Sequence, residues 1–230
     1  MAMAVMLPLV YDIMKDIVGM IPGEQLDKYQ SLMPVNIFNN FSIYTWSQWN
    51  AKNLTQIGTI ITILVGMNLI AGEINSQTAS FLLTRPISRR TVFFSKALAG
   101  ALIIILSVAV STLAMIITVQ FTPHSLEAGR LTVATIITTA GFLVLLALTM
   151  FFSTIIDEPV KAGGLTVLVV IIMSVFGIFR QTRPLSLFNH MYAAQYFLGG
   201  VFPLRPLVVM GLMVIALLGA GIYIFERKEV

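Results

Sequence analysis

The sequence predicts an all-α polytopic membrane protein, and three observations support this fold class. Of the 230 residues, 57% are apolar and only 10% are charged, and the mean hydropathy is +0.92. Several stretches without charge are long enough, at 1.5 Å rise per residue, to cross roughly 30 Å of hydrocarbon as a helix. Because these stretches are continuously apolar rather than alternating, they exclude a membrane β-barrel.

The chain begins with a short apolar segment and a more polar region. Residues 1–10 would form a helix only about 15 Å long, half a bilayer, and are interpreted as the truncated last half of a first span. In the outer region 11–52, apolar residues from Ile13 to Ile21 recur at spacings of three and four residues, which predicts a helix lying on the membrane surface. An aromatic belt at the headgroup level is expected from three side chains just before the next span: Tyr44, Trp46 and Trp49.

Five complete transmembrane helices are predicted after this region, within a single transmembrane domain covering 1–230. They are expected at 53–72, 97–121, 131–155, 163–179 and 207–225. Segment 180–206 is expected to be either an interfacial cap or a pair of short re-entrant helices.

Polar and small residues inside these spans have a structural explanation. Hydroxyl and amide side chains can bond a backbone carbonyl or a neighbouring helix, and glycine lets helices approach closely. The residues expected to act in this way are Asn68, Thr112, Thr118, Thr135 and Thr138, and Gly100, Gly141, Gly219 and Gly221.

The distribution of lysine and arginine predicts the orientation. Each side of the membrane would carry seven basic residues. The seven in loop 73–96, the 156–162 turn and the chain end occupy a much shorter total length of loop than the seven on the other side. Since basic residues concentrate on the cytoplasmic side, loop 73–96 and the C-terminus are expected in the cytoplasm.

Several function classes are excluded by what the sequence lacks. It has no cysteine, and its two histidines, His124 and His190, are far apart in the chain. No metalloprotease, nucleophile-elbow or phosphate-loop motif occurs, and no ionisable residue lies at the centre of a predicted span. We therefore expect no catalytic residue, no metal and no cofactor. The net charge of +4 reflects loop topology, so no nucleic-acid partner is expected.

One loop has an unusual pattern. It reads AGEINSQTASFLLTRPISRRTVFFSK over residues 71–96, with a lone Glu73 before four basic residues. Ile74 to Thr84 can form a short interfacial helix, and Pro86 disfavours helix at Arg85. Ser88 is then the predicted N-cap of a helix running to Phe121. From charge alone, the loop could simply be a positive-inside loop.

In its details the loop resembles the first cytoplasmic loop of type-2 ATP-binding-cassette (ABC) permeases. The family pattern is roughly G-E-x-x-x-G-T-x-x-x-L-L-[ST]-x-P-[IV]-S-R, followed by a lysine. The matching residues are Gly72, Glu73, Thr78, Leu82, Leu83, Thr84, Pro86, Ile87, Ser88, Arg89 and Lys96. Gln77 stands where the family usually has glycine. The spacing of the spans and the ending Phe-Glu-Arg-Lys-Glu are also similar to the family.

The resemblance implies a non-catalytic permease subunit of the prokaryotic cell membrane. Its partners would be an ABC ATPase subunit that hydrolyses ATP and a second permease, identical or different, with export the commoner direction. Residues 74–84 would dock on the ATPase, and the residues implied in coupling are Glu73, Thr78, Leu82, Leu83, Arg85, Pro86 and Arg89.

A second, weaker contact with the ATPase is considered at Asp157 and Glu158, which also suit the N-terminus of the fourth span. The alternatives to the permease are a self-contained channel or carrier not driven by ATP, and a membrane assembly or sensor protein without transport.

Overall fold

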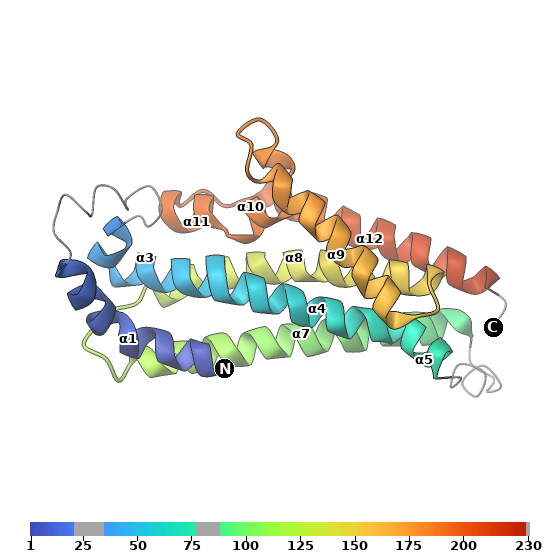
Figure 1. Ribbon diagram of the computed structural model, residues 1–230, viewed down its shortest axis with the longest axis horizontal. Helices are drawn as coiled ribbons and strands as arrows, with labels where there is room; N and C mark the ends of the chain where they lie inside the picture. Colours follow the sequence, from blue (N-terminus) through green and yellow to red (C-terminus); the bar gives the residue numbers. More distant parts are fainter. Residues whose placement is uncertain (21–34, 77–87, 229–230) are drawn as a thin grey trace.

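The computed structural model describes residues 1–20, 35–76 and 88–228, and these residues form helices without any strand (Figure 1). The all-α prediction is therefore confirmed for the described residues. In chain order the elements are α1 (Ala2–Gly19), η1 (Val35–Asn39), α3 (Phe41–Trp46), η2 (Ser47–Leu54), α4 (Thr55–Leu69), α5 (Ala71–Asn75), α7 (Arg89–Val119), α8 (Ala128–Ile155), α9 (Pro159–Phe176), η3 (Arg183–Leu185), α10 (Leu187–Met191), α11 (Ala194–Gly199) and α12 (Leu204–Arg227).

Four helices in the described part of the chain are long and apolar enough to cross a membrane: α7, α8, α9 and α12. The span expected at 53–72 is not among them, because α4 has only 15 residues. However, α4 follows directly on α3 and the π-helical segment η2, so the chain is helical from Phe41 to Leu69. The four helices make the protein a multi-pass membrane protein.

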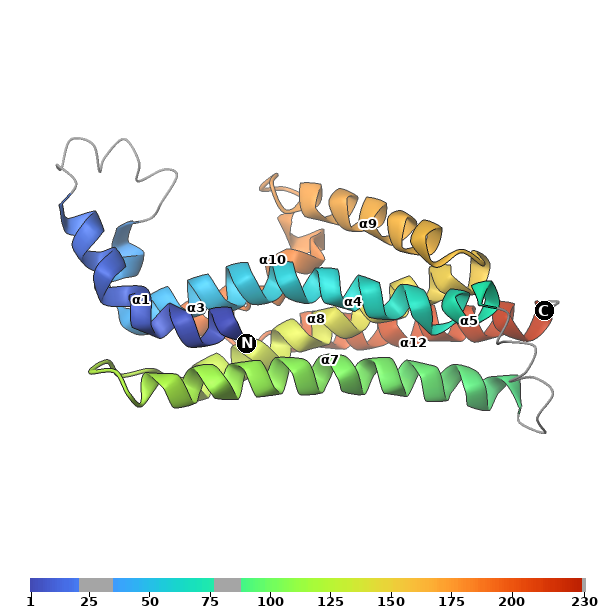
Figure 2. The same cartoon turned by 60° about the horizontal axis from the view of Figure 1, so that its bottom comes forward.

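The centre of the bundle is α8. Two thirds of its most apolar window is buried, against one third for α7 and less for α9 and α12. Helices α4, α7, α8 and α12 run along the long axis, whereas α9 leans away and α10 lies between it and the rest of the bundle (Figures 1 and 2). The bundle has two ends: the "α5 end", with α5, the start of α7 and the chain's C-terminus, and the "α3 end", with α3 and the α7–α8 turn.

Close helix contacts form at three of the four glycines named for this role. A Cβ atom added to Gly141 would lie 2.2 Å from the Met191 side chain, and one at Gly100 would lie 2.9 Å from Leu69. At Gly221 it would lie 3.0 Å from Phe93. The prediction for Gly219 is wrong, because nothing lies within 4 Å of an added Cβ there.

A buried hydrogen-bond network joins the π-helical segment to α8 and α10. The Asn50 amide nitrogen donates to Thr138 Oγ1 at 3.2 Å, and Thr135 Oγ1 donates to Asn50 Oδ1 at 3.2 Å. Thr138 Oγ1 donates to the Met191 carbonyl at 2.6 Å, and Trp49 Nε1 donates to Thr112 Oγ1 at 3.3 Å.

The expected structural role is thus confirmed for all five residues: Thr112, Thr135 and Thr138 bond partners on other elements, and Thr118 and Asn68 bond backbone carbonyls of their own helices. Asn50 was not named from sequence, although it is fully buried at the middle of this network.

The first part of the chain differs from expectation in two ways. The apolar start of the chain and the following polar residues form one continuous helix, α1, which ends at Gly19 and contains Pro8 in its interior. The aromatic belt is also wrong: Tyr44, Trp46 and Trp49 are each at most 8% exposed. Trp46 Nε1 donates to the Tyr192 carbonyl at 3.0 Å, so this ring joins α3 to the segment after α10.

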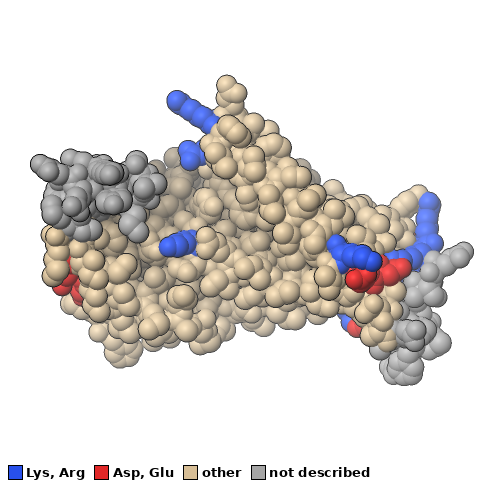
Figure 3. Space-filling view, in the orientation of Figure 1, with Lys and Arg blue, Asp and Glu red and all other residues tan. Residues whose placement is uncertain are grey.

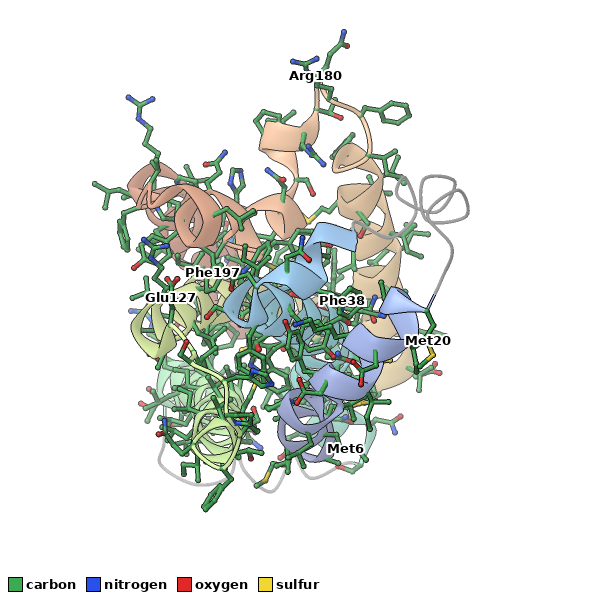
Figure 4. All side chains as sticks on the ribbon, turned by 90° about the vertical axis from the view of Figure 1, so that its left-hand side faces the viewer. Met6, Met20, Phe38, Glu127, Arg180 and Phe197 are labelled. Atoms are coloured by element: carbon green, nitrogen blue, oxygen red, sulfur yellow. The ribbon has the colours of Figure 1, made fainter. Side chains whose placement is uncertain are left out.

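Segment 180–206 contains the three short helices η3, α10 and α11. Leu187, Phe188 and Met191 of α10 are buried in the main hydrophobic core with residues of α8. Arg180 lies at the tip of the turn after α9, which projects away from the bundle (Figure 4). The segment is therefore anchored through α10.

Candidate coupling site at the α5 end

The α5 end brings together four segments that are far apart in sequence. These are α5, the first turns of α7, the turn between α8 and α9, and the end of α12. On the face shown in Figure 3, acidic and basic side chains gather at this end, beside a broad uncharged surface. The predicted loop 73–96 starts and finishes here.

The turn between α4 and α5 is held by a serine of α8. Ser153 Oγ accepts from the Ala71 amide at 2.7 Å and the Ile70 amide at 3.3 Å, and it donates to the Met67 carbonyl at 3.1 Å. Ser153, Ile70 and Ala71 are all at most 3% exposed. The direction in which α5 leaves the bundle is therefore fixed by α8.

Sequence reasoning missed Ser153, since a single serine in an apolar run carries no signal of its partner. Its only sequence cue is its position close to the end of a predicted span.

An ion pair connects the two sides of the loop. The Lys96 ammonium of α7 contacts the Glu73 carboxylate of α5, with the two side chains 30% and 28% exposed. A partly buried pair of this kind is screened less by salt than an exposed one. Glu73 is thus tied to the same helix that the loop leads into.

The start of α7 is capped as predicted. Ser88 Oγ accepts from the Thr91 amide at 3.2 Å, and the helix begins at Arg89. The Arg89 guanidinium donates to the carbonyls of Phe225 and Lys228 at the end of α12. These are carbonyls that the end of a helix leaves without intrahelical partners. Arg89 therefore joins α7 to α12.

The weaker candidate pair, Asp157 and Glu158, lies at the same end. Pro159 occupies the first turn of α9, as expected for a helix start. Asp157 forms an ion pair with Lys228, and Glu158 pairs with Lys161 at 2.6 Å. Both carboxylates remain substantially exposed, so their surface stays accessible.

The structure thus brings Glu73, Arg89, Asp157 and Glu158 to one end of the bundle. The remaining predicted coupling residues lie outside the described residues: Thr78, Leu82, Leu83, Arg85 and Pro86, with Gln77 beside them.

The α3 end has its own polar cluster. His124 lies 2.9 Å from the Asp12 carboxylate and stacks on Phe41 at 4.7 Å between ring centroids. Burial, and then the neighbouring Asp12 carboxylate, raise the pKa of Tyr11, whose hydroxyl donates to the Phe38 carbonyl at 2.7 Å. Figure 4 looks onto this end, with Phe38 and Glu127 labelled. The cluster ties α1 to η1 and to the α7–α8 turn.

The chain's second histidine, His190, lies in segment 180–206. His190 bonds only the Pro184 carbonyl among its described contacts, at 2.8 Å. Among the described residues, no group of three or more histidine and acidic side chains is placed to hold a metal ion. The contacts at the α5 end instead join helix ends.

Comparison with known proteins gives one family. The family model described as "ABC-2 family transporter protein" matches residues 2–230. No match to a curated protein was found.

Proposed function

Because the chain belongs to the ABC-2 transporter family, we propose that its α5 end couples the membrane helices of an ABC transporter to a separate ATPase subunit. The chain is a membrane permease, a transport component of a kind that is generally non-catalytic and normally works with an ABC ATPase. In the proposal, residues 74–84 dock on that ATPase, and Glu73 and Arg89 pass its movement into the bundle.

The observation that carries this proposal is the double attachment of α5. Ser153 holds the α4–α5 turn to α8, and the Glu73–Lys96 pair holds α5 to α7. A displacement applied to the loop between α5 and α7 would therefore act on three helices together. A loop that served topology alone would need no such attachment.

The finer architecture belongs to the same proposal. The continuous helical stretch from Phe41 to Leu69 is long enough, at 1.5 Å per residue, to serve as a fifth span. Segment 180–206 would dip into the outer leaflet, with the α5 end and the C-terminus in the cytoplasm. A second permease subunit would complete the pathway, and export would be the direction of transport.

The test first asks whether a phosphate-loop ATPase is encoded beside the gene, and then expresses the chain in membranes together with that candidate ATPase. Co-purification establishes the complex, and ATP-dependent accumulation of lipids and amphiphilic compounds in inside-out vesicles identifies a substrate. Glu73→Ala and Arg89→Ala should leave membrane abundance and ATP hydrolysis in place but abolish most ATP-dependent transport.

Glu127→Ala is the matched control, because Glu127 also forms an ion pair, with Arg130, but at the α3 end. Unchanged transport by both Glu73→Ala and Arg89→Ala at normal abundance would refute the coupling role. Transport by the isolated chain in liposomes without ATP would instead indicate a self-contained channel or carrier.

A further inference from the structure

The last described residues of the chain join three segments of the α5 end. We propose that Glu226 and Lys228 are positioning residues that clasp the end of α12 to the base of α7 and to the α8–α9 turn, so that these helix ends move as one body during coupling. The contacts among Arg89, Arg90, Asp157, Glu226 and Lys228 are called the α12 clasp below. This inference rests on the proposed coupling function and extends it beyond the loop.

The first half of the clasp joins α7 to α12. Arg90 Nε and a terminal nitrogen of the same guanidinium donate to the two oxygens of Glu226, the second at 3.3 Å. A fork of this kind fixes orientation as well as distance. The neighbouring Arg89 donates to two carbonyls of the same helix end, so successive arginines hold one turn of α12.

The second half joins α12 to the turn between α8 and α9. Lys228 Nζ donates to the Thr154 carbonyl at 2.8 Å and pairs with Asp157. The Lys228 side chain is only 16% exposed, and Thr154 is fully buried. Since the carbonyl of Lys228 also accepts from Arg89, this one residue bridges α7 and the α8–α9 turn.

The clasp lies over a small hydrophobic cluster that includes the start of the coupling loop. Phe93 of α7 is fully buried and packs against Phe225 of α12 at 6.0 Å between ring centroids. Ile70, at the α4–α5 turn, belongs to the same cluster, and Ile74 of α5 packs against it. The clasp and the coupling turn thus share one core.

This arrangement predicts what the clasp does. When the ATPase displaces the base of α7, the clasp carries α12 and the α8–α9 turn with it. Without the clasp, α7 would move but α12 and α9 would follow less closely. ATP hydrolysis would then continue while less substrate crosses the membrane.

A charge-exchange experiment tests the clasp. Arg90→Glu and Glu226→Arg are made singly and together, and their thermal unfolding in detergent is measured on the purified chain. Each single variant should unfold at a lower temperature, and the double variant should recover, because the pair is restored in the opposite sense. Failure of the double variant to recover, or single variants with unchanged unfolding, would overturn the contact.

The coupling role is tested by the amount of substrate transported per ATP hydrolysed in the permease–ATPase complex. Each single variant should lower this ratio by about threefold or more at normal abundance, with recovery in the double variant. A merely structural role would lower abundance and leave the ratio unchanged, and that outcome would refute the proposal. Exchange of the exposed pair Glu127 and Arg130 at the α3 end is the matched control.

A covalent version of the clasp gives an independent test. The chain has no cysteine, so Arg90→Cys with Glu226→Cys introduces the only two thiols. With this disulfide formed, the amount transported per ATP should rise above its level in the reduced double variant, which lacks the Arg90–Glu226 pair, because the two helix ends are again held together.

Loss of transport on oxidation, restored by a reductant, would show that the ends must separate and would overturn the proposal. If the wild-type chain binds no ATPase, the proposed function fails, while the unfolding experiment still decides whether the contact exists.

Discussion

The hydrogen bonds of Ser153 make a quantitative prediction about how α5 is attached. Ser153→Ala removes the only described side-chain acceptor of the Ala71 and Ile70 amides and the donor to the Met67 carbonyl. Leaving one buried donor unpaired costs about 1–3 kcal/mol, whereas helix–helix hydrogen bonds measured in membranes average nearer 0.6. Because Ser153 is fully buried and its bond to Ala71 is short, we expect a loss of about 1–2 kcal/mol in the free energy of unfolding.

The assay is unfolding of the purified chain in mixed micelles by titration with a denaturing detergent, monitored by helical circular dichroism. Ser174→Ala is the matched control, because the Ser174 hydroxyl is exposed and, within the described part of the chain, bonds only the Val170 carbonyl of its own helix. The control should change the free energy by less than about 0.5 kcal/mol. Equal effects of the two substitutions, or no effect of Ser153→Ala, would refute the argument that α8 fixes the α4–α5 turn.

Two further substitutions test the packing around α8. Asn50→Leu should destabilise the protein by about 1–3 kcal/mol, since it leaves buried threonine hydroxyls without their amide partner. Asn68→Leu, at an exposed site, should be nearly neutral in the same unfolding titration. Gly141→Ala should lower the free energy of unfolding by about 1–3 kcal/mol, because the added methyl would meet Met191 at 2.2 Å. Gly219→Ala, where nothing lies within 4 Å of an added Cβ, should be neutral or slightly stabilising. A thermal shift of the same sign and size for both variants would contradict this.

Sequence reasoning located features that depend on neighbours along the chain. Ser88 caps α7 and Pro159 starts α9 as predicted, because both signals act within one turn of a helix. The charge-free stretches gave the four long apolar helices for a similar reason, since a span depends on local composition. Local rules were enough for these elements.

Features that depend on distant partners were missed or misread. Tyr44, Trp46 and Trp49 have the composition of a membrane-interface belt, but Tyr44 packs against Tyr11 of α1, Trp46 stacks on Phe197 of α11 and Trp49 donates to Thr112 of α7. No local pattern announces those partners. The roles of Ser153 and Asn50 depend on partners that lie more than 80 residues away in the sequence. The continuity of α1 through Pro8 was equally hidden, since proline usually ends a helix.

The basic residues of the α5 end serve two roles that can be separated. Arg89, Arg90, Lys96, Lys161 and Lys228 each have a described partner, a carboxylate or a backbone carbonyl. Arg227 lies over the Tyr223 ring at 3.9 Å from its centroid. Acidic partners contribute little to topology, so in the proposed cytoplasmic orientation of the α5 end these residues would still act as positive-inside charges during insertion.

In the folded bundle, the same side chains also make contacts with the protein. Replacing arginine by lysine would keep the topological charge but lose the fork that holds Glu226 and the α12 carbonyls. Arg89→Lys and Arg90→Lys should therefore insert normally and yet couple poorly. This difference distinguishes a structural coupling site from a cluster explained by topology alone.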